Sequence, residues 1–453
     1  MAHKQNVLER LSEAKIMVLG FILVICAGAF LLMLPISSKD WVYTDFLTAI
    51  FTSTSATCVT GLVLVDTYTY WSTFGQTVII VLIQLGGLGF MTMAGVFSLS
   101  LKRKISFKQR MLTAESYNQE NVEGIINLTR YVIFGTLIFE GIGAIILSFC
   151  FIDEYGILGG IRRGVFHSIS AFCNAGFDIL GDKGEFSSLI TKNSSSVVLY
   201  TVMVLITIGG LGFSVWKNIY DKIMYKKRFN LHSKLVLSVS LFLVLSGFIL
   251  FFIFEYSNFN TLGSLSLFDK INNALFQSVT TRTAGFAAID QMALCENTKF
   301  LSVILMFIGG SPGSTAGGIK TVTLAVVIVS AISVIKGNKD VNIFNRRISQ
   351  NLILRCLAIV VLGMFVILTS TMIIFSIEEF EFMDILFEVT SAFATVGLSA
   401  GITPSLSLAS KIILIMLMFF GRVGVLTITW ALVLKSKSTL PKIRYPKEHI
   451  SVG

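Results

Sequence analysis

Four short segments, each with a glycine as its next-to-last residue, carry the residues best suited to chemistry. They read ATCVTGL, AFCNAGF, TTRTAGF and AFATVGL, and their glycines, Gly61, Gly176, Gly285 and Gly397, are 115, 109 and 112 residues apart. The two residues before each glycine are for the most part small or hydroxylated; they are Val59 and Thr60, Asn174 and Ala175, Thr283 and Ala284, and Thr395 and Val396. Glycine permits the dihedral angles that aim successive backbone carbonyls at a cation, and carbonyls replace its hydration shell without a fixed charge. We therefore predict that these residues form a selectivity filter for a monovalent cation, and a calcium-type ring of carboxylates is disfavoured.

Three aspartates and one arginine flank the predicted filter. Asp66, Asp178 and Asp290 follow three of the glycines by two to five residues. They either concentrate cations at the outer mouth or only solvate it, and the sequence leaves both roles open. Arg282 precedes Gly285 by three residues, and we expect it to brace the filter from behind by contacting a neighbouring pore helix.

A glycine-rich segment, FIGGSPGSTAGGIKT, occupies residues 307–321. Its five glycines and one proline between residues 309 and 318 cannot hold a continuous helix, and non-helical backbone at membrane depth is buried in protein or lines water. We predict a movable gate loop below the filter, made of Gly309, Gly310, Ser311, Pro312, Gly313, Ser314, Thr315, Ala316, Gly317, Gly318 and Lys320. The alternative, a phosphate-binding Walker loop, fails by one inserted residue, Ile319, and no strand precedes the segment.

Arg422 lies within the apolar segment FFGRVGV. An arginine at membrane depth is costly and is by default a functional candidate. Facing the pore, Arg422 would raise a barrier to cations below the filter and interact with the gate loop. The alternative is a buried salt bridge with Glu140 or Glu388.

These residues must be positioned by membrane helices, because 54% of the 453 residues are hydrophobic, 14% are charged and the mean hydropathy is +0.79. Paired long apolar runs occupy residues 16–36 and 77–100, 129–152 and 196–216, 235–256 and 299–335, and 352–377 and 410–435. Between the two runs of each pair lies a short apolar stretch, at 46–58, 164–174, 271–282 and 384–395. About 12 helical residues cover less than ~20 Å, so each short stretch is predicted to enter and leave on one side.

A second motif recurs after each filter segment, as QLGGLGF, TIGGLGF, FIGGSPG and FFGRVGV. The predicted fold is therefore an all-α, K+ channel-like membrane protein with eight transmembrane helices and four re-entrant pore helices. Its four tandem helix–pore loop–helix repeats in pseudo-four-fold arrangement are residues 1–110, 111–228, 229–345 with the broken second helix, and 346–453 with a cytoplasmic tail.

Charge distribution predicts the orientation. Segments 101–110, 217–234, 336–347 and 435–447 hold 20 of the 36 Lys and Arg and only two Asp. Positive residues stay on the cytoplasmic side, so both termini are predicted to be cytoplasmic in a multi-pass protein of the cytoplasmic membrane. Each basic run flanks an apolar span, which disfavours nucleic-acid binding. The dispersed six Cys and four His favour neither a metal site nor an enzyme.

The four glycine segments, the GGSPGSTAGGIKT loop and the intramembrane arginine together resemble the Trk/Ktr/HKT superfamily of potassium transporters over essentially the whole chain. The chain is most similar to the membrane subunit of bacterial Ktr systems, of the KtrB and KtrD type. The resemblance implies that Gly61, Gly176, Gly285 and Gly397 select potassium, that residues 309–320 form the gate and that Arg422 forms the barrier.

The resemblance also implies partners. Family members form homodimers and assemble with a cytosolic ring of RCK/KTN-type nucleotide-binding subunits (KtrA/KtrC type), whose ATP or ADP state controls opening. Transport in the family is often sodium-stimulated. We expect no cofactor on this chain itself, potassium as substrate, and contacts between its basic cytoplasmic segments and that ring. A sodium- or proton-coupled secondary transporter is the alternative, although neither an inverted repeat nor a chain of membrane carboxylates favours it.

Overall fold

The computed structural model describes residues 13–89, 111, 125–338 and 340–424, and the description below is confined to them. This part of the chain is almost entirely helical, with one two-stranded hairpin. The elements, in order, are α1 (Glu13–Met33), η2 (Pro35–Ser37), α2 (Phe46–Thr57), α3 (Thr67–Tyr70), α4 (Thr73–Leu88), α7 (Ile125–Phe172), η3 (Ile190–Lys192), α8 (Ser196–Gly210), α9 (Phe213–Tyr225), α10 (Leu231–Glu255), η4 (Phe259–Gly263), α11 (Leu267–Thr280), α12 (Glu296–Phe307), α13 (Thr321–Ile335), β1 (Asn342–Ile343), β2 (Arg346–Arg347), α14 (Gln350–Phe375), α15 (Phe382–Ala394), η5 (Thr403–Ser405) and α16 (Leu408–Val423).

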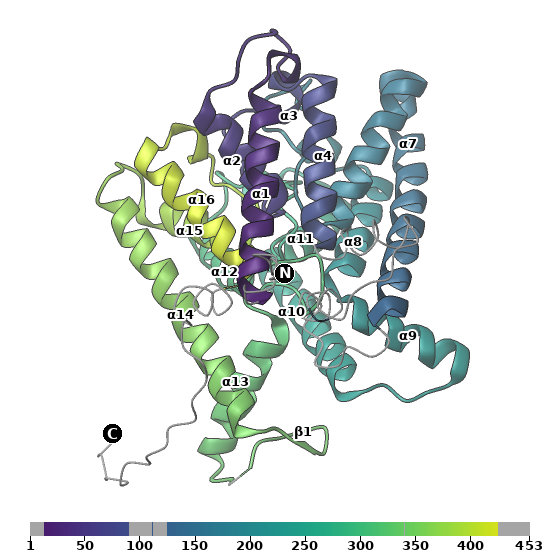
Figure 1. The fold of residues 1–453 in the computed structure, drawn as a ribbon, viewed down its shortest axis with the longest axis vertical. Helices are drawn as coiled ribbons and strands as arrows, with labels where there is room; N and C mark the ends of the chain where they lie inside the picture. Colours follow the sequence, from purple (N-terminus) through teal and green to yellow (C-terminus); the bar gives the residue numbers. More distant parts are fainter. Residues whose placement is uncertain (1–12, 90–110, 112–124, 339, 425–453) are drawn as a thin grey trace, which may run out of the picture.

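Long helices alternate with short buried ones (Figure 1). The short helices α2, α11 and α15 and the C-terminal part of α7 coincide with the predicted short apolar stretches. In the second unit the long and the short helix are continuous in α7 except at Gly156, where φ is 69° and ψ is 173°. Asp45 begins α2 by accepting hydrogen bonds from the backbone N–H groups of Leu47 and Thr48. The repeat boundaries at 110, 228 and 345 stay a prediction, and the first of them lies outside the described residues.

Four described helices are long and apolar enough to cross a membrane. They are Lys15–Met33, Ile126–Phe172, Leu231–Glu255 and Gln350–Phe375, and α8 with α9 makes a fifth if that bent pair counts as one span. In the second unit the predicted apolar run 196–216 is not one straight helix. Helix α8 ends at Gly210, and α9 leaves it at an angle of 99° instead of continuing to residue 216.

A glycine with positive φ ends the second helix in three of the four units. Gly89, Gly212 and Gly424 have φ of 83°, 92° and 93° and ψ of 133°, 138° and 131°. A side chain would disfavour this conformation, so the second glycine motif is a helix-ending device. The third unit is therefore not alone in having an interrupted second helix. It replaces a one-glycine turn with the longer segment between Phe307 and Thr321.

Glycines in the first helices allow close packing against the short helices. A Cβ atom added at Gly28 would lie 2.5 Å from the Ser53 hydroxyl oxygen, and one added at Gly143 would lie 2.6 Å from the Ser168 hydroxyl oxygen. Ser53 donates a hydrogen bond of 2.7 Å to the carbonyl of Ile25. The same pattern of a glycine facing a serine recurs with Gly247 and Ser278. Close approach of helix backbones is the usual means of association in a membrane, because lipid tails give no hydrophobic drive between helices.

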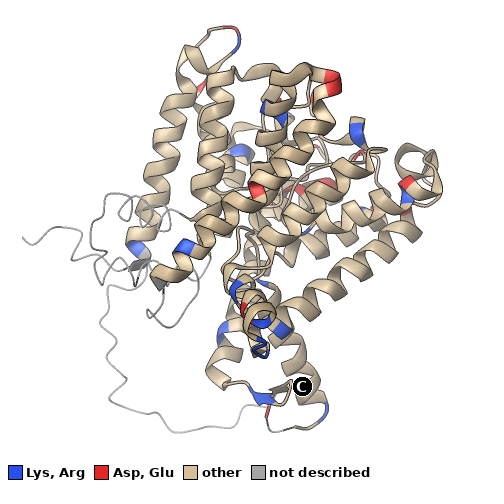
Figure 2. Ribbon diagram, turned by 90° about the vertical axis from the view of Figure 1, so that its right-hand side faces the viewer, with Lys and Arg blue, Asp and Glu red and all other residues tan. Residues whose placement is uncertain are grey.

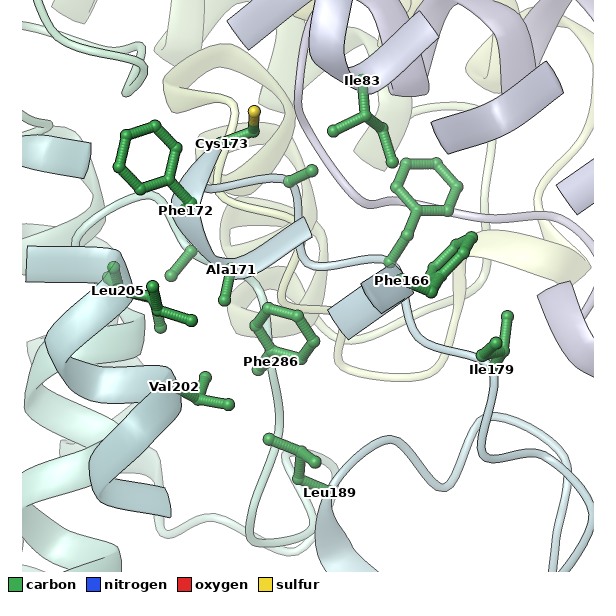
Figure 3. Close-up of a cluster of buried hydrophobic side chains, with 14 of the residues drawn as sticks. Ile83, Phe166, Ala171, Phe172, Cys173, Ile179, Leu189, Val202, Leu205 and Phe286 are labelled. Carbon is green, nitrogen blue, oxygen red and sulfur yellow. The ribbon is translucent and has the colours of Figure 1, made fainter. Parts of the chain in front are cut away.

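The largest apolar cluster packs behind the loop that follows α7. Figure 3 shows Phe172 and Ala171 of α7 beside Val202 and Leu205 of α8, with Phe286 of the third unit in the same group. Both phenylalanines are fully buried. The cluster thus joins the second unit to the third and holds the two adjacent loops in fixed relative positions.

The two ends of the molecule differ in charge. Helix α9, the hairpin β1–β2 and the C-terminal part of α13 lie at the lower end in Figure 1, away from α3. Lys and Arg gather at that end in Figure 2, which agrees with the predicted basic segments 217–234 and 336–347. The other two predicted basic segments, 101–110 and 435–447, lie outside the described residues.

Candidate ion pathway

The four glycine loops share one backbone conformation. Each is entered through a residue in the left-handed region two positions before the glycine, and the glycine itself has positive φ. The φ angles are 58° at Val59, 59° at Asn174, 64° at Thr283 and 52° at Thr395, and 98° at Gly61, 69° at Gly176, 78° at Gly285 and 92° at Gly397. Left-handed backbone is uncommon for residues other than glycine, so its occurrence at four equivalent positions is a feature of the fold and not of one loop.

The four loops touch one another in a closed cycle. A Cβ atom added at Gly61 would clash with the carbonyl oxygen of Ala175, in the second loop. The corresponding clashes continue from Gly176 to the Ala284 oxygen, from Gly285 to the Val396 oxygen and from Gly397 back to the Thr60 oxygen. Each glycine therefore faces the carbonyl that precedes the next glycine, and the cycle closes after four steps. Residues more than 100 positions apart in the chain thereby surround one axis.

Hydroxyl groups of the short helices hold the loops in place. Ser55 and Ser391 each accept a hydrogen bond of 3.0 Å from the backbone N–H of Gly61 and Gly397. In the other two loops the hydroxyl donates instead, from Ser170 to the Phe177 carbonyl and from Thr280 to the Phe286 carbonyl, both at 2.6 Å. Because the short helices end just before these loops, the negative ends of their dipoles lie beside the cycle.

A cavity of about 570 Å³ opens over the cycle and is lined by all four glycines. Asp66, Asp178 and Asp290 also line the cavity. They differ in burial and in hydrogen bonding. The carboxylate of Asp66 is buried and accepts N–H groups of its own and a neighbouring loop, including that of Phe186 at 2.9 Å, so it acts as a brace. Asp290 is exposed. Burial raises the pKa of Asp178 to about 7, and nearby Asp66 adds to the effect.

The glycine-rich segment between α12 and α13 lies against the other side of the loops. It closes on itself through hydrogen bonds from the N–H of Gly309 to the Ile319 carbonyl (2.9 Å) and from the N–H of Thr321 to the Gly310 carbonyl (3.1 Å). The Thr315 hydroxyl donates to the carbonyl of Phe172 at 3.2 Å and lies 3.3 Å from the Asn174 amide. A Cβ added at Gly317 would meet the Thr395 side chain. The segment therefore contacts both the second and the fourth loop.

Lys320 belongs to the same segment and folds back on it. Its ammonium donates to the carbonyl of Ala316 at 2.7 Å and to that of Gly317 at 3.4 Å. The segment follows helix α12 and not a strand, which disfavours a Walker loop.

Arg422 joins this segment to the first unit. Its guanidinium donates hydrogen bonds to the carbonyl of Thr315 and to those of Gly86 and Gly87, at the end of α4. The alternative salt bridge is wrong, because Glu388 instead accepts from Ser399 and Thr403, and Glu140 from Gln84. A guanidinium with five fixed donors suits a position where three carbonyls converge.

Comparison with known proteins identifies the family of the chain. Residues 4–440 match the family model of TrkH, described as cation transport protein. The chain belongs to the TrkH family of cation transport proteins. The potassium/sodium uptake protein NtpJ of Enterococcus hirae is 40% identical over 99% of both chains. The Ktr system potassium uptake protein B of Bacillus subtilis is 40% identical over 98% of this chain and 97% of its own. A crystal structure of the potassium transporter TrkH from Vibrio parahaemolyticus shares the fold, with a TM-score of 0.73 at 17% identity, over 96% of this chain and 87% of that one. The predicted resemblance to the Trk and Ktr proteins is thus confirmed.

One site residue of this TrkH-family chain lies elsewhere than expected. Arg282 was predicted to contact a neighbouring pore helix, but its guanidinium donates to the Ser240 hydroxyl at 3.2 Å, on α10, the first helix of its own unit. The prediction failed because an arginine side chain reaches several Å in any direction, and sequence position alone does not select the partner.

The sequence reading also missed the hydroxyl residues that support the loops in this TrkH-family protein. Ser55, Ser170 and Ser391 each precede the loop glycine by six residues, and Thr280 precedes Gly285 by five. Aligning the four segments on their glycines would have found this recurrence. The hydrogen bonds that use it appear only in the folded chain.

Proposed function

We propose that this chain carries potassium ions into the cell through a channel-like pore in the cytoplasmic membrane, with the ions coordinated by backbone carbonyls of the four glycine loops. The observation that carries the proposal is the closed cycle in which each loop glycine faces the carbonyl of the next loop. In such a cycle, backbone oxygens surround the ion and carry no fixed negative charge. The glycines leave room for the ion between the loops because they have no side chains. This is the arrangement that replaces the hydration shell of a potassium ion.

The substrate is assigned from two further observations. The four loops all carry glycine at the equivalent position, so the same backbone geometry is available on each side of the ion. The relatives from Bacillus subtilis and Enterococcus hirae are named as uptake proteins for potassium and for potassium and sodium. Potassium is therefore the transported ion, and sodium stimulates its transport.

The segment 309–320 is the gate of this pore, and Arg422 is its electrostatic barrier. Support comes from position: the segment contacts the second and fourth loops on the side opposite the open cavity. Arg422 holds the segment through the Thr315 carbonyl and adds a positive charge to the path. Displacement of the segment would open the path and would break those hydrogen bonds.

Control of the gate comes from a partner. Three relatives are named as subunits of Ktr systems, and in this proposal the chain forms a homodimer that docks on a cytosolic ring of RCK/KTN-type subunits. ATP or ADP binds to that ring and not to this chain. The docking surface in this proposal is formed by the basic segments 101–110 and 435–447, which lie outside the described residues.

Flux through the purified protein tests the proposal. Vesicles that contain the protein and are loaded with potassium are expected to release it passively, faster than they release sodium, and without any imposed sodium or proton gradient. Deleting residues 311–318 should increase that flux, because the gate segment is shortened. If potassium release strictly required a sodium or proton gradient, the pore hypothesis would be rejected in favour of a coupled secondary transporter. An unchanged flux after the deletion would exclude the segment as the gate.

A further inference from the structure

Helix α9 (Phe213–Tyr225) has one half packed in the protein and one half exposed. Trp216 packs against Phe139 and Phe172 of α7, with ring centroids 5.5 and 5.6 Å apart. At the C-terminal end of the helix the apolar side chains are uncovered, and Ile223, Met224 and Tyr225 are 71%, 61% and 63% exposed. An apolar helix end left in this state needs a partner that is itself apolar.

The exposed half of α9 lies against α7. The ring of Tyr220 lies 5.9 Å from that of Tyr131, and Tyr131 belongs to the described helix Ile126–Phe172, which is long and apolar enough to cross a membrane. In Figure 1, α9 lies at the lower, basic end of the molecule. Tyrosine beside a spanning helix at its basic end suits the boundary between acyl chains and headgroups.

Basic residues follow the exposed apolar ones. Residues 213–228 hold five Lys and Arg and one Asp. Asp221 is 3.7 Å from Lys227, and Lys222 lies 4.0 Å from the Phe229 ring centroid. Lys217, Lys226 and Arg228 are exposed. Apolar side chains inserted at the interface with a basic cluster beside them are typical of segments that bind anionic lipids.

We propose that residues 213–228 bind the anionic phospholipid headgroups of the inner leaflet, and that the bound lipid holds the gate segment in its present position. The choice of a lipid over a cytosolic protein rests on the exposed apolar side chains of α9, which lies against a helix long and apolar enough to cross a membrane. The second half of the proposal rests on the proposed function, because it takes 309–320 as the gate.

The coupling runs through backbone hydrogen bonds at the start of α9. The N–H of Phe213 donates to the Gly313 carbonyl at 2.8 Å, the N–H of Ser311 to the Gly210 carbonyl at 3.0 Å, and the N–H of Thr315 to the Gly209 carbonyl at 3.3 Å. At the bend between them, a Cβ added to Gly212 would lie 2.7 Å from the Pro312 carbonyl. A tilt of α9 about this bend therefore moves the gate segment, and a lipid that prevents the tilt keeps it in place.

The test compares lipid binding and flux in one charge variant and its matched control. The variant is Lys222→Gln/Lys226→Gln/Lys227→Gln, and the control is Lys336→Gln/Arg346→Gln/Arg347→Gln, which removes the same charge from exposed residues at the same end of the molecule. Native mass spectrometry measures retained phosphatidylglycerol against phosphatidylcholine. Potassium flux is measured in vesicles of phosphatidylcholine with and without a quarter of phosphatidylglycerol, which changes the surface potential equally for all proteins.

We expect about a fivefold loss of phosphatidylglycerol retention per contacting lysine replaced, from the usual strength of such contacts, in the α9 variant only. Phosphatidylglycerol should lower the flux of the wild-type and control proteins and leave that of the α9 variant unchanged. Equal retention and equal lipid response in all three proteins would overturn the proposal. So would a variant that keeps its lipid response but loses binding of a cytosolic regulatory subunit, since the surface would then be a protein-docking site. Absence of potassium flux from every protein, with lipid retention still lost in the α9 variant, would instead refute the proposed function and leave the lipid site standing.

Discussion

Replacing Gly61 by serine tests the carbonyl cycle most directly. The glycine has φ of 98°, and a left-handed conformation costs an ordinary residue about 1–2 kcal/mol. The added Cβ would also clash with the Ala175 carbonyl oxygen, which must move by about 1 Å before van der Waals distance is restored. That oxygen is one of the four in the cycle, so the substitution displaces a proposed ligand of the ion while leaving the rest of the protein in place.

The expected result is a loss of selectivity with a smaller loss of stability. Weakening of potassium coordination relative to sodium by about 1.4 kcal/mol is a tenfold change, so we expect the ratio of potassium to sodium flux to fall at least about tenfold. The flux ratio is measured in loaded vesicles, and the melting temperature is followed in detergent to verify folding. Backbone strain should lower the free energy of unfolding by about 1–2 kcal/mol, which leaves most of the protein folded.

Gly141→Ser is the matched control for this substitution. Gly141 lies in α7, and a Cβ added there would have nothing within 4 Å. We expect its flux ratio to equal that of the wild type. If Gly61→Ser is folded and its flux ratio stays within about twofold of the control, the carbonyls of the cycle do not select the ion, and the reasoning that joins the glycine motif to potassium is wrong.

Two further predictions concern charge along the path. Arg422→Gln should raise potassium flux about tenfold or more, because a unit charge ~8 Å from a cation costs about 2 kcal/mol at an effective dielectric constant of 20. Arg422→Lys keeps the charge and should raise the flux less. Equal effects of the two substitutions would assign the role of Arg422 to hydrogen bonding. Because burial raises the pKa of Asp178 to about 7, its carboxylate is neutral at pH 6 and charged at pH 8, so flux at low external potassium should rise with outer pH. Asp178→Asn should abolish that rise, and a rise that persists in the variant would exclude this group as its source.

The four glycine loops and the non-helical segment between α12 and α13 were predictable because their signals are local. Four glycines recur at intervals of 109 to 115 residues, each after a short apolar stretch, and this recurrence marks them as equivalent. Five glycines and a proline within residues 309–318 exclude a continuous helix there. The helix ends at Gly89, Gly212 and Gly424 were not predicted. A lone glycine in an apolar run is tolerated in many helices, so the sequence pattern alone does not reveal the positive φ that the structure has at these three positions.

By itself the sequence determined that this is a helical membrane protein with four related segments, because hydropathy, length and glycine spacing act over a dozen residues or fewer. Only the tertiary structure decided which groups meet. Gly397 faces the carbonyl of Thr60, Arg422 reaches Thr315 and not a glutamate, and Arg282 contacts Ser240. Contacts between residues so far apart depend on how whole helices pack, and a side chain with several possible partners takes the one that packing brings within hydrogen-bond distance.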